Sequence, residues 1–115
     1  MRIKLIPRRK IKPAKFKTQW TELQKFCKSK DTWPLAIINA DKLLDEALKK
    51  KHLKGRSMGE RLVEAQKLLS DNDGVWYSHN LAKKLLDSYG RLKETEVKKS
   101  LVGIRQALRD LGALE

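Results

Sequence analysis

The sequence predicts an all-α protein, a compact up-and-down bundle of four to five helices that follows an extended basic N-terminal arm. Apolar residues recur at helical spacing through most of residues 18–115, and no segment there has the alternating pattern of a β-strand. Only six glycines and three prolines occur, which leaves little irregular chain. A chain of 115 residues has room for one core, so we divide it into an arm, residues 1–17, and a helical bundle domain, residues 18–115.

The arm is defined by its charge. Eight of the first seventeen residues are basic, none is acidic, and Pro7 and Pro13 oppose a continuous helix. The alternation of Ile3, Leu5 and Ile11 could form a short edge strand or dock on the domain. Nothing in this segment can bury enough apolar surface to offset the entropy lost on ordering, so disorder is the default expectation. Residues 1–30 contain eleven basic residues and one acid, Glu22, so most of the formal charge of +13 lies at this end.

The first two helices are predicted from caps and apolar spacing. Thr18 is the expected N-cap of a helix of about ten residues, because Trp20, Leu23, Phe26 and Cys27 then share one face. Asp31 or Thr32 caps the second helix. It continues to about Lys51, and Pro34 lies in its first turn, where a missing N–H is harmless.

Three further helices follow. Ser57-Met58-Gly59-Glu60 is a capping box and predicts a helix over residues 58–69. A polar turn then separates a fourth helix, from about Asp73 to Leu86, with its inward residues at Val75, His79, Ala82, Leu85 and Leu86. A fifth helix, from about Glu94 to Asp110, presents Val97, Leu101, Ile104 and Leu108 to the core.

Four short motifs in this order resemble a family of bacterial helical domains related to the HEPN superfamily. They are WPLAIINADKLLD, MGERL, WYSH and ALRDLG at residues 33–45, 58–62, 76–79 and 107–112. The resemblance implies a four- or five-helix bundle that often pairs as a homodimer. In active members, it implies RNA cleavage by an Arg that binds phosphate and a His that acts on the 2′-hydroxyl, contributed by both protomers.

The chain departs from this catalytic pattern. Where relatives have Arg-Asn after the Trp–His element and a further His about four residues later, this chain has Ala82, Lys83 and Asp87. Neither His52 nor His79 has an Arg four to seven residues before it. We therefore predict that the fold is kept and the nuclease lost, so that the protein is not an enzyme, has no catalytic residues and uses no cofactor.

A group of polar residues is predicted to be structural. Asp41 and Asp45 lie one helical turn apart, and with Glu60 and Arg61 they could resemble a carboxylate metal site. Metal sites in helix bundles typically use Glu-x-x-His motifs on facing helices, and this sequence has none. We expect no metal, and instead a polar network that joins Asp41 to Arg61 and His79.

The predicted function is binding of a polyanion, RNA rather than DNA. The residues assigned to it are those of the arm and two lysines on the polar face of the fourth helix: Arg2, Lys4, Arg8, Arg9, Lys10, Lys12, Lys15, Lys17, Lys83 and Lys84. Nineteen lysines against eight arginines favour phosphate contacts over bidentate base readout. We expect Trp20, Trp33 and Trp76 to pack in the core. Base stacking would require exposure beside Lys or Arg, and Trp20, next to the arm, is the best candidate for it.

Two other functions stay open. The protein could be an interaction or homodimerisation module whose arm docks on an acidic partner or on the second protomer. It could also bind an anionic membrane surface through Ile3, Leu5 and Ile6 together with the lysines, although the prolines oppose an amphipathic helix there.

Sequence features also predict where the protein acts. No segment approaches the roughly 20 apolar residues of a membrane span. After Leu5 and Ile6 the chain returns to Pro and Arg, without the apolar region of a secretory signal. The single Cys27 cannot form an internal disulfide, which indicates a reducing compartment. We predict a cytoplasmic protein.

Overall fold

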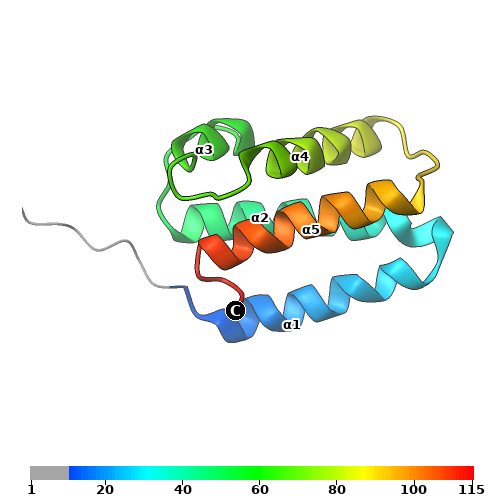
Figure 1. The fold of residues 1–115 in the computed structure, drawn as a ribbon, viewed down its shortest axis with the longest axis horizontal. Coiled ribbons are helices and arrows are strands. Elements are labelled where there is room, and N and C mark those ends of the chain that lie inside the picture. The colour runs from blue at the N-terminus through cyan, green and yellow to red at the C-terminus, as the bar shows by residue number, and fades with distance from the viewer. Residues whose placement is uncertain (1–10) are drawn as a thin grey trace, which may run out of the picture.

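The computed structural model describes residues 11–115 and contains five α-helices (Figure 1). They are α1 Pro13–Gln24, α2 Trp33–Lys50, α3 Met58–Glu64, α4 Asn72–Asp87 and α5 Glu94–Asp110, with two short 3₁₀ turns, η1 Lys25–Lys28 and η2 Lys30–Thr32, between α1 and α2. No β-strand occurs within the described range. The predicted all-α bundle is confirmed.

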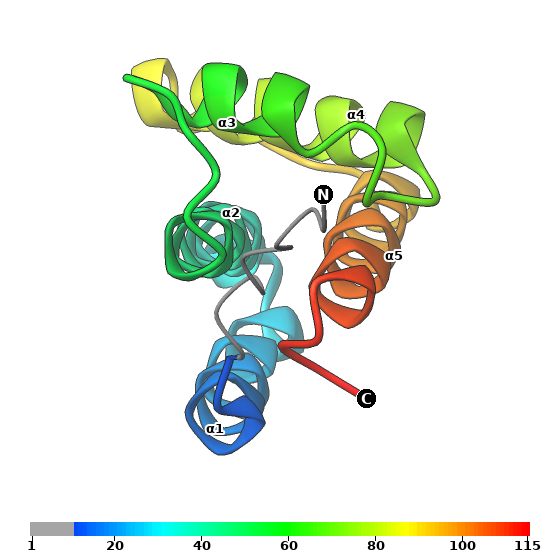
Figure 2. The ribbon, with the colours of Figure 1, turned by 90° about the vertical axis from the view of Figure 1, so that its left-hand side faces the viewer.

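Helix α2 is the centre of the bundle. It packs against α1, α3, α4 and α5, and α4 also packs on α5. Figure 2 shows α1, α2 and α5 nearly end-on, with α4 crossing over α2 and α5 at an angle. The crossing of α4 and α5 is close, because a Cβ added to Gly103 would lie 2.8 Å from the carbonyl oxygen of Gly74.

The hydrophobic core consists of two clusters. The larger one joins α1 to α2 and α5, and its largest members include Phe16, Trp20, Leu44, Leu48, Ile104 and Leu108. The smaller one lies between α2, α4 and α5 and contains Ile37, Ile38, Ala82, Leu85 and Val97. Every long helix therefore contributes its apolar face to a shared interior, as the spacing of its residues predicts.

The arm prediction is wrong for residues 11–17. Helix α1 begins at Pro13, not after Thr18, and the Thr18 hydroxyl instead donates to the carbonyl oxygen of Ala14 at 3.0 Å. Pro13 starts this helix rather than breaking it, because the first turn needs no N–H donor from it. Ile11 and Phe16 are buried to 9% and 2% exposure, so α2 and α5 supply the apolar surface that the segment lacks by itself. The rest of the predicted arm, residues 1–10, lies outside the described residues.

The other helices agree with the prediction except in two places. Helix α2 follows Thr32 with Pro34 in its first turn, α4 lies within one residue of its predicted bounds, and α5 has the predicted bounds. Leu86, predicted to face inward, is 64% exposed.

Helix α3 ends at Glu64, five residues before the predicted end. Beyond it the backbone continues in tighter turns, in which the N–H of Gln66 donates to Val63 and that of Leu68 to Ala65. The N–H of Leu69 still donates to the carbonyl oxygen of Ala65, and both residues are buried as their spacing of four predicts, whereas Leu68 is 36% exposed.

Candidate functional site

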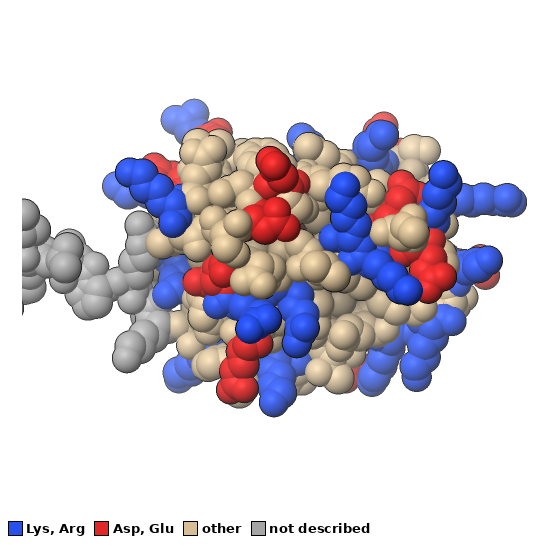
Figure 3. Space-filling model, in the orientation of Figure 1, with Lys and Arg blue, Asp and Glu red and all other residues tan. Residues whose placement is uncertain are grey.

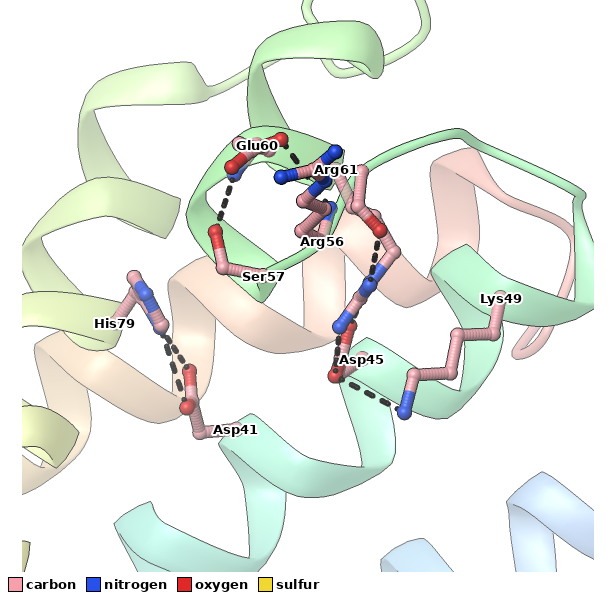
Figure 4. Close-up of polar contacts among 9 residues, drawn as sticks. Asp41, Asp45, Lys49, Arg56, Ser57, Glu60, Arg61 and His79 are labelled. Atoms are coloured by element: carbon pink, nitrogen blue, oxygen red, sulfur yellow. Dashed lines mark hydrogen bonds and ion pairs between the residues drawn. The ribbon is translucent and has the colours of Figure 1, made fainter.

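The predicted polar network is divided into two separate pairs that join different helices (Figure 4). The first joins α2 to α4. Nδ1 of His79 lies 3.1 and 3.2 Å from the two carboxylate oxygens of Asp41, so with the ring proton assigned to Nδ1 this nitrogen donates to the carboxylate. Both side chains are buried, and the ring of Trp76 meets the His79 ring edge-on with 5.9 Å between centroids.

Burial dominates the electrostatics of the first pair. Desolvation raises the pKa of Asp41, while the hydrogen bond and charge of His79 lower it in part and the charge of Asp45 raises it further. Within residues 11–115, the imidazole is the one side chain that hydrogen-bonds to this carboxylate.

The second pair joins α2 to α3. Nε and Nη2 of Arg61 donate to the two carboxylate oxygens of Asp45 at 2.7 and 2.8 Å, which is a bidentate pair. Nη1 of Arg61 donates to the carbonyl oxygen of Gly55 at 2.8 Å, and Nζ of Lys49 lies 3.6 Å from Asp45. The hydrogen bonds that Arg61 donates to Asp45 raise the pKa of Arg61, so the guanidinium remains charged.

Arg61 therefore pairs with Asp45, where the sequence analysis expected Asp41. The two acids lie one turn apart on α2, and only the packing of α3 and α4 decides which partner each one meets. Glu60 is separate from both, since Oε1 accepts the backbone N–H of Arg56 at 3.2 Å while its own N–H donates to Oγ of Ser57. These contacts hold the start of α3.

Both pairs hold neighbouring helices together. Each carboxylate has a cationic or hydrogen-bonding partner on a neighbouring helix, and so holds that helix against α2. Within residues 11–115, no three His, Cys, Asp or Glu side chains gather closely enough to hold a metal ion. Cys27 is partly buried, and desolvation raises the pKa of its thiol, which opposes formation of the reactive thiolate.

In contrast to these paired residues, the described lysines assigned to polyanion binding are exposed and outside the ion pairs. Lys12, Lys15 and Lys17 are exposed, and none of them takes part in the five ion pairs found in the described part of the chain. Lys83 and Lys84 on α4 are also exposed and outside these pairs. The remaining five, Arg2, Lys4, Arg8, Arg9 and Lys10, lie outside the described residues.

The lysines of α1 contribute to an uneven surface charge. In Figure 3, Lys and Arg side chains predominate along the lower edge, where α1 lies, and at the right-hand end, with acidic side chains among them. Glu22 is the one acid in residues 1–30, and its carboxylate is held by Nζ of Lys25 at 3.1 Å. The positive charge of this region has little compensation from its own helix.

The three tryptophans pack in or against the core, as predicted. Trp20 is 7% exposed within the larger core cluster, so it cannot stack on a base, and Nε1 of Trp33 donates to the carbonyl oxygen of Cys27. The exposed aromatic side chain is Tyr89, at 55%, in the connection between α4 and α5. Tyr89 is not among the residues predicted from the sequence, although its neighbours Gly90 and Arg91 indicate an exposed basic loop.

In comparisons with protein-family models, curated proteins and solved structures, the chain has no match. The resemblance to HEPN-related domains therefore stays a prediction. None of the helices described is long and apolar enough to cross a lipid bilayer.

Proposed function

We propose that this protein is a non-enzymatic, HEPN-like RNA-binding domain of the cytoplasm, whose basic N-terminal region contacts the phosphates. One observation carries the proposal: Lys12, Lys15 and Lys17 are exposed and stand outside every ion pair of the described residues. An ammonium group without a counter-charge in its own protein is available to a polyanion. Five more basic residues precede these three in the sequence, with no acid among them.

The fold gives these lysines a fixed position. Because Phe16 and Trp20 anchor α1 in the core, the backbone that bears Lys15 and Lys17 is already ordered before RNA arrives. Binding then costs less conformational entropy than it would for a disordered segment. Neutralisation of about five to eight phosphates would give a log–log salt slope of about −4 to −7.

The absence of catalysis is part of the proposal. His79 is the histidine of the Trp–His element, and it is buried with Nδ1 committed to Asp41. Ala82 and Lys83 stand where active relatives have Arg and Asn, so the phosphate-binding and catalytic groups of those relatives have no equivalent on α4. These features favour a binding role over RNA cleavage.

A charge-matched pair of variants tests the proposal. The variant Lys12→Gln/Lys15→Gln/Lys17→Gln removes three charges near the start of α1. Its control, Lys50→Gln/Lys54→Gln/Lys67→Gln, removes three exposed lysines elsewhere. We expect the first to lower the affinity for single-stranded RNA about a hundredfold at about 0.1 M salt and to reduce the salt slope by about 2, and the control to change both much less.

Fluorescence anisotropy over a range of salt concentrations measures both quantities. Equal losses in the two variants would show that only net charge matters, and tight binding that survives about 0.5 M salt would also contradict the proposal.

Homodimerisation is a second candidate property. The HEPN resemblance implies it, and three large apolar side chains, Val63, Leu86 and Val102, are more than half exposed. Light scattering of the purified protein after nuclease treatment distinguishes a dimer from two chains bridged by RNA.

A further inference from the structure

Two connections meet at one end of the bundle, the right-hand end in Figure 1. One is the α1–α2 connection, residues 25–32, and the other is the α4–α5 connection, residues 88–93. The hydroxyl of Tyr89 donates to the backbone carbonyl of Asp31 at 2.7 Å and so ties the two together. We call these two segments the basic end.

The basic end is strongly cationic. It contains five basic residues, Lys25, Lys28, Lys30, Arg91 and Lys93, and a single acid, Asp31. Apart from Lys25, which holds Glu22, none of these basic residues takes part in an ion pair within the described chain. This charge suits a polyanion and opposes a basic partner.

The basic end also contains a surface depression, and the ring of Tyr89 lines it. Residues from both connections contribute to this depression, and one acid lies among its basic groups. It is lined by Lys30, Asp31, Pro34, Tyr89, Gly90, Arg91 and Leu92. The Tyr89 side chain is 55% exposed although its hydroxyl is hydrogen-bonded. The hydrogen bond restricts the ring while much of the side chain stays open to solvent. An exposed ring beside lysine and arginine is the arrangement with which proteins stack a nucleic-acid base and contact its phosphates.

We propose that the basic end is a binding site for single-stranded RNA, in which an unpaired base stacks on Tyr89 and the flanking phosphates contact Lys30 and Arg91. This inference rests on the proposed RNA-binding function and adds the choice of strand to it. In a duplex, both faces of each base are covered by neighbouring bases, so only an unpaired base can stack on the ring.

Helix α1 connects this site with the N-terminal lysines. Its twelve residues span about 18 Å, and it runs from Pro13 at the opposite end of the bundle to the basic end (Figure 1). Lys25 and Lys28 follow directly after it. A single strand that contacts one of the lysines near the start of α1 would therefore have to extend over this length to reach Tyr89.

Two substitutions separate stacking from a purely structural role of Tyr89. Tyr89→Phe keeps the aromatic ring and removes the hydrogen bond to Asp31. Tyr89→Leu keeps an apolar side chain and removes the aromatic face. If the ring stacks on a base, the leucine variant loses affinity and the phenylalanine variant keeps most of it. If Tyr89 only ties the two connections together, both variants change alike.

Three probes complete the test: a uridine oligomer of about twelve nucleotides, the same backbone with abasic sites, and an RNA duplex. We expect Tyr89→Leu to weaken binding of the uridine strand by about tenfold or more, and to change binding of the abasic strand and the duplex by less than about threefold. Tyr89→Phe should stay within about threefold of the wild type on all three. Thermal unfolding followed by circular dichroism tests whether each variant is folded.

The possible failures can be told apart. If the wild type binds neither strand, the proposed function fails, and with it this inference. If the triple lysine variant loses affinity while Tyr89→Leu binds the uridine strand like the wild type, only the stacking site is wrong. Equal weakening of the uridine and abasic strands by Tyr89→Leu would also overturn it. If polyglutamate competes as well as the uridine strand does, the basic end is only an electrostatic surface that also suits acidic proteins, and the stacking site is wrong.

Discussion

Helices α1 and α2 present their charged side chains in opposite ways. On α2, Asp41 and Asp45 point toward neighbouring helices, and each is satisfied there by His79 or Arg61 (Figure 4). On α1, Lys15 and Lys17 point to solvent and pair with no carboxylate of the described residues. The position of each helix explains the difference. Helix α2 is surrounded by other helices, so its acids lose water and need partners, whereas α1 lies at the edge and buries one face only.

The comparison separates charges that hold the fold from charges that are free to bind. Substitutions of Asp41 and Asp45 on α2 should therefore change stability, and under the proposed function lysine substitutions on α1 should change RNA affinity. The apolar face of α1 is the exception, because it is what fixes those lysines in place.

The largest expected effect concerns that apolar face. Phe16 is 2% exposed in the larger core cluster, so Phe16→Ala should lower the free energy of unfolding by about 3–5 kcal/mol. Lys15→Ala, on the exposed side of the same helix, should change it by less than about 0.5 kcal/mol. Urea denaturation measures both. A loss below about 1 kcal/mol for Phe16→Ala would mean that this segment behaves as the arm that the sequence predicts.

The second effect concerns the Asp45–Arg61 pair between α2 and α3. Asp45→Ala leaves the Arg61 side chain, 11% exposed, without its bidentate partner, and should cost about 2 kcal/mol of stability. Adding Arg61→Met should restore part of this loss, because an unpaired guanidinium is then no longer desolvated. Chemical denaturation of the wild type and the two variants measures both effects. Equal stability of Asp45→Ala and the double variant would show that the unpaired guanidinium carries no desolvation penalty, and equal stability of Asp45→Ala and the wild type would show that the pair contributes little.

The smallest effect is a dependence on pH. Since burial raises the pKa of Asp41 in the folded protein, the folded state holds this proton more tightly than the unfolded chain, whose pKa is about 3.9. Ionisation of Asp41 therefore reduces stability as the pH rises above about 3.9 and through the raised pKa.

Asp41→Asn should abolish this part of the pH profile, since the amide oxygen can still accept from His79 but cannot ionise. Denaturation curves at several pH values measure the difference between variant and wild type, which should grow in favour of the variant as the pH rises. Asp87→Asn, at an exposed carboxylate of α4, is the matched control. A profile for Asp41→Asn that stays parallel to that of the wild type would contradict this account.

The helices were predictable where a local signal marks their ends. Ser57 and Pro34 mark the starts of α3 and α2, and Gly112, with φ of 79°, ends α5 in the left-handed conformation that glycine readily adopts. Helix α2 ends in the same way but at His52, with φ of 58°. The His52 N–H donates to Lys49 and the Leu53 N–H to Leu48, so the hydrogen bonds of the helix end close there on an exposed non-glycine residue, which is harder to predict than a glycine.

The site was predictable in composition and not in pairing. The sequence identifies Asp41, Asp45, Glu60, Arg61 and His79 as polar residues of the bundle, but their partners depend on how α3 and α4 approach α2. Tyr89 was missed for the same reason. Its exposure and its bond to Asp31 exist only because two connections, 58 residues apart in the chain, meet at one end.

By itself, the sequence determined that the protein is all-α, where most of its helices lie, and that its positive charge gathers toward the N-terminus, because helical spacing, caps and charge are local properties of the chain. Tertiary structure alone decided that residues 11–17 belong to the bundle, which acid meets which base, and which aromatic ring stays outside. Those outcomes depend on apolar surface and partners that distant segments supply, and no local pattern contains them.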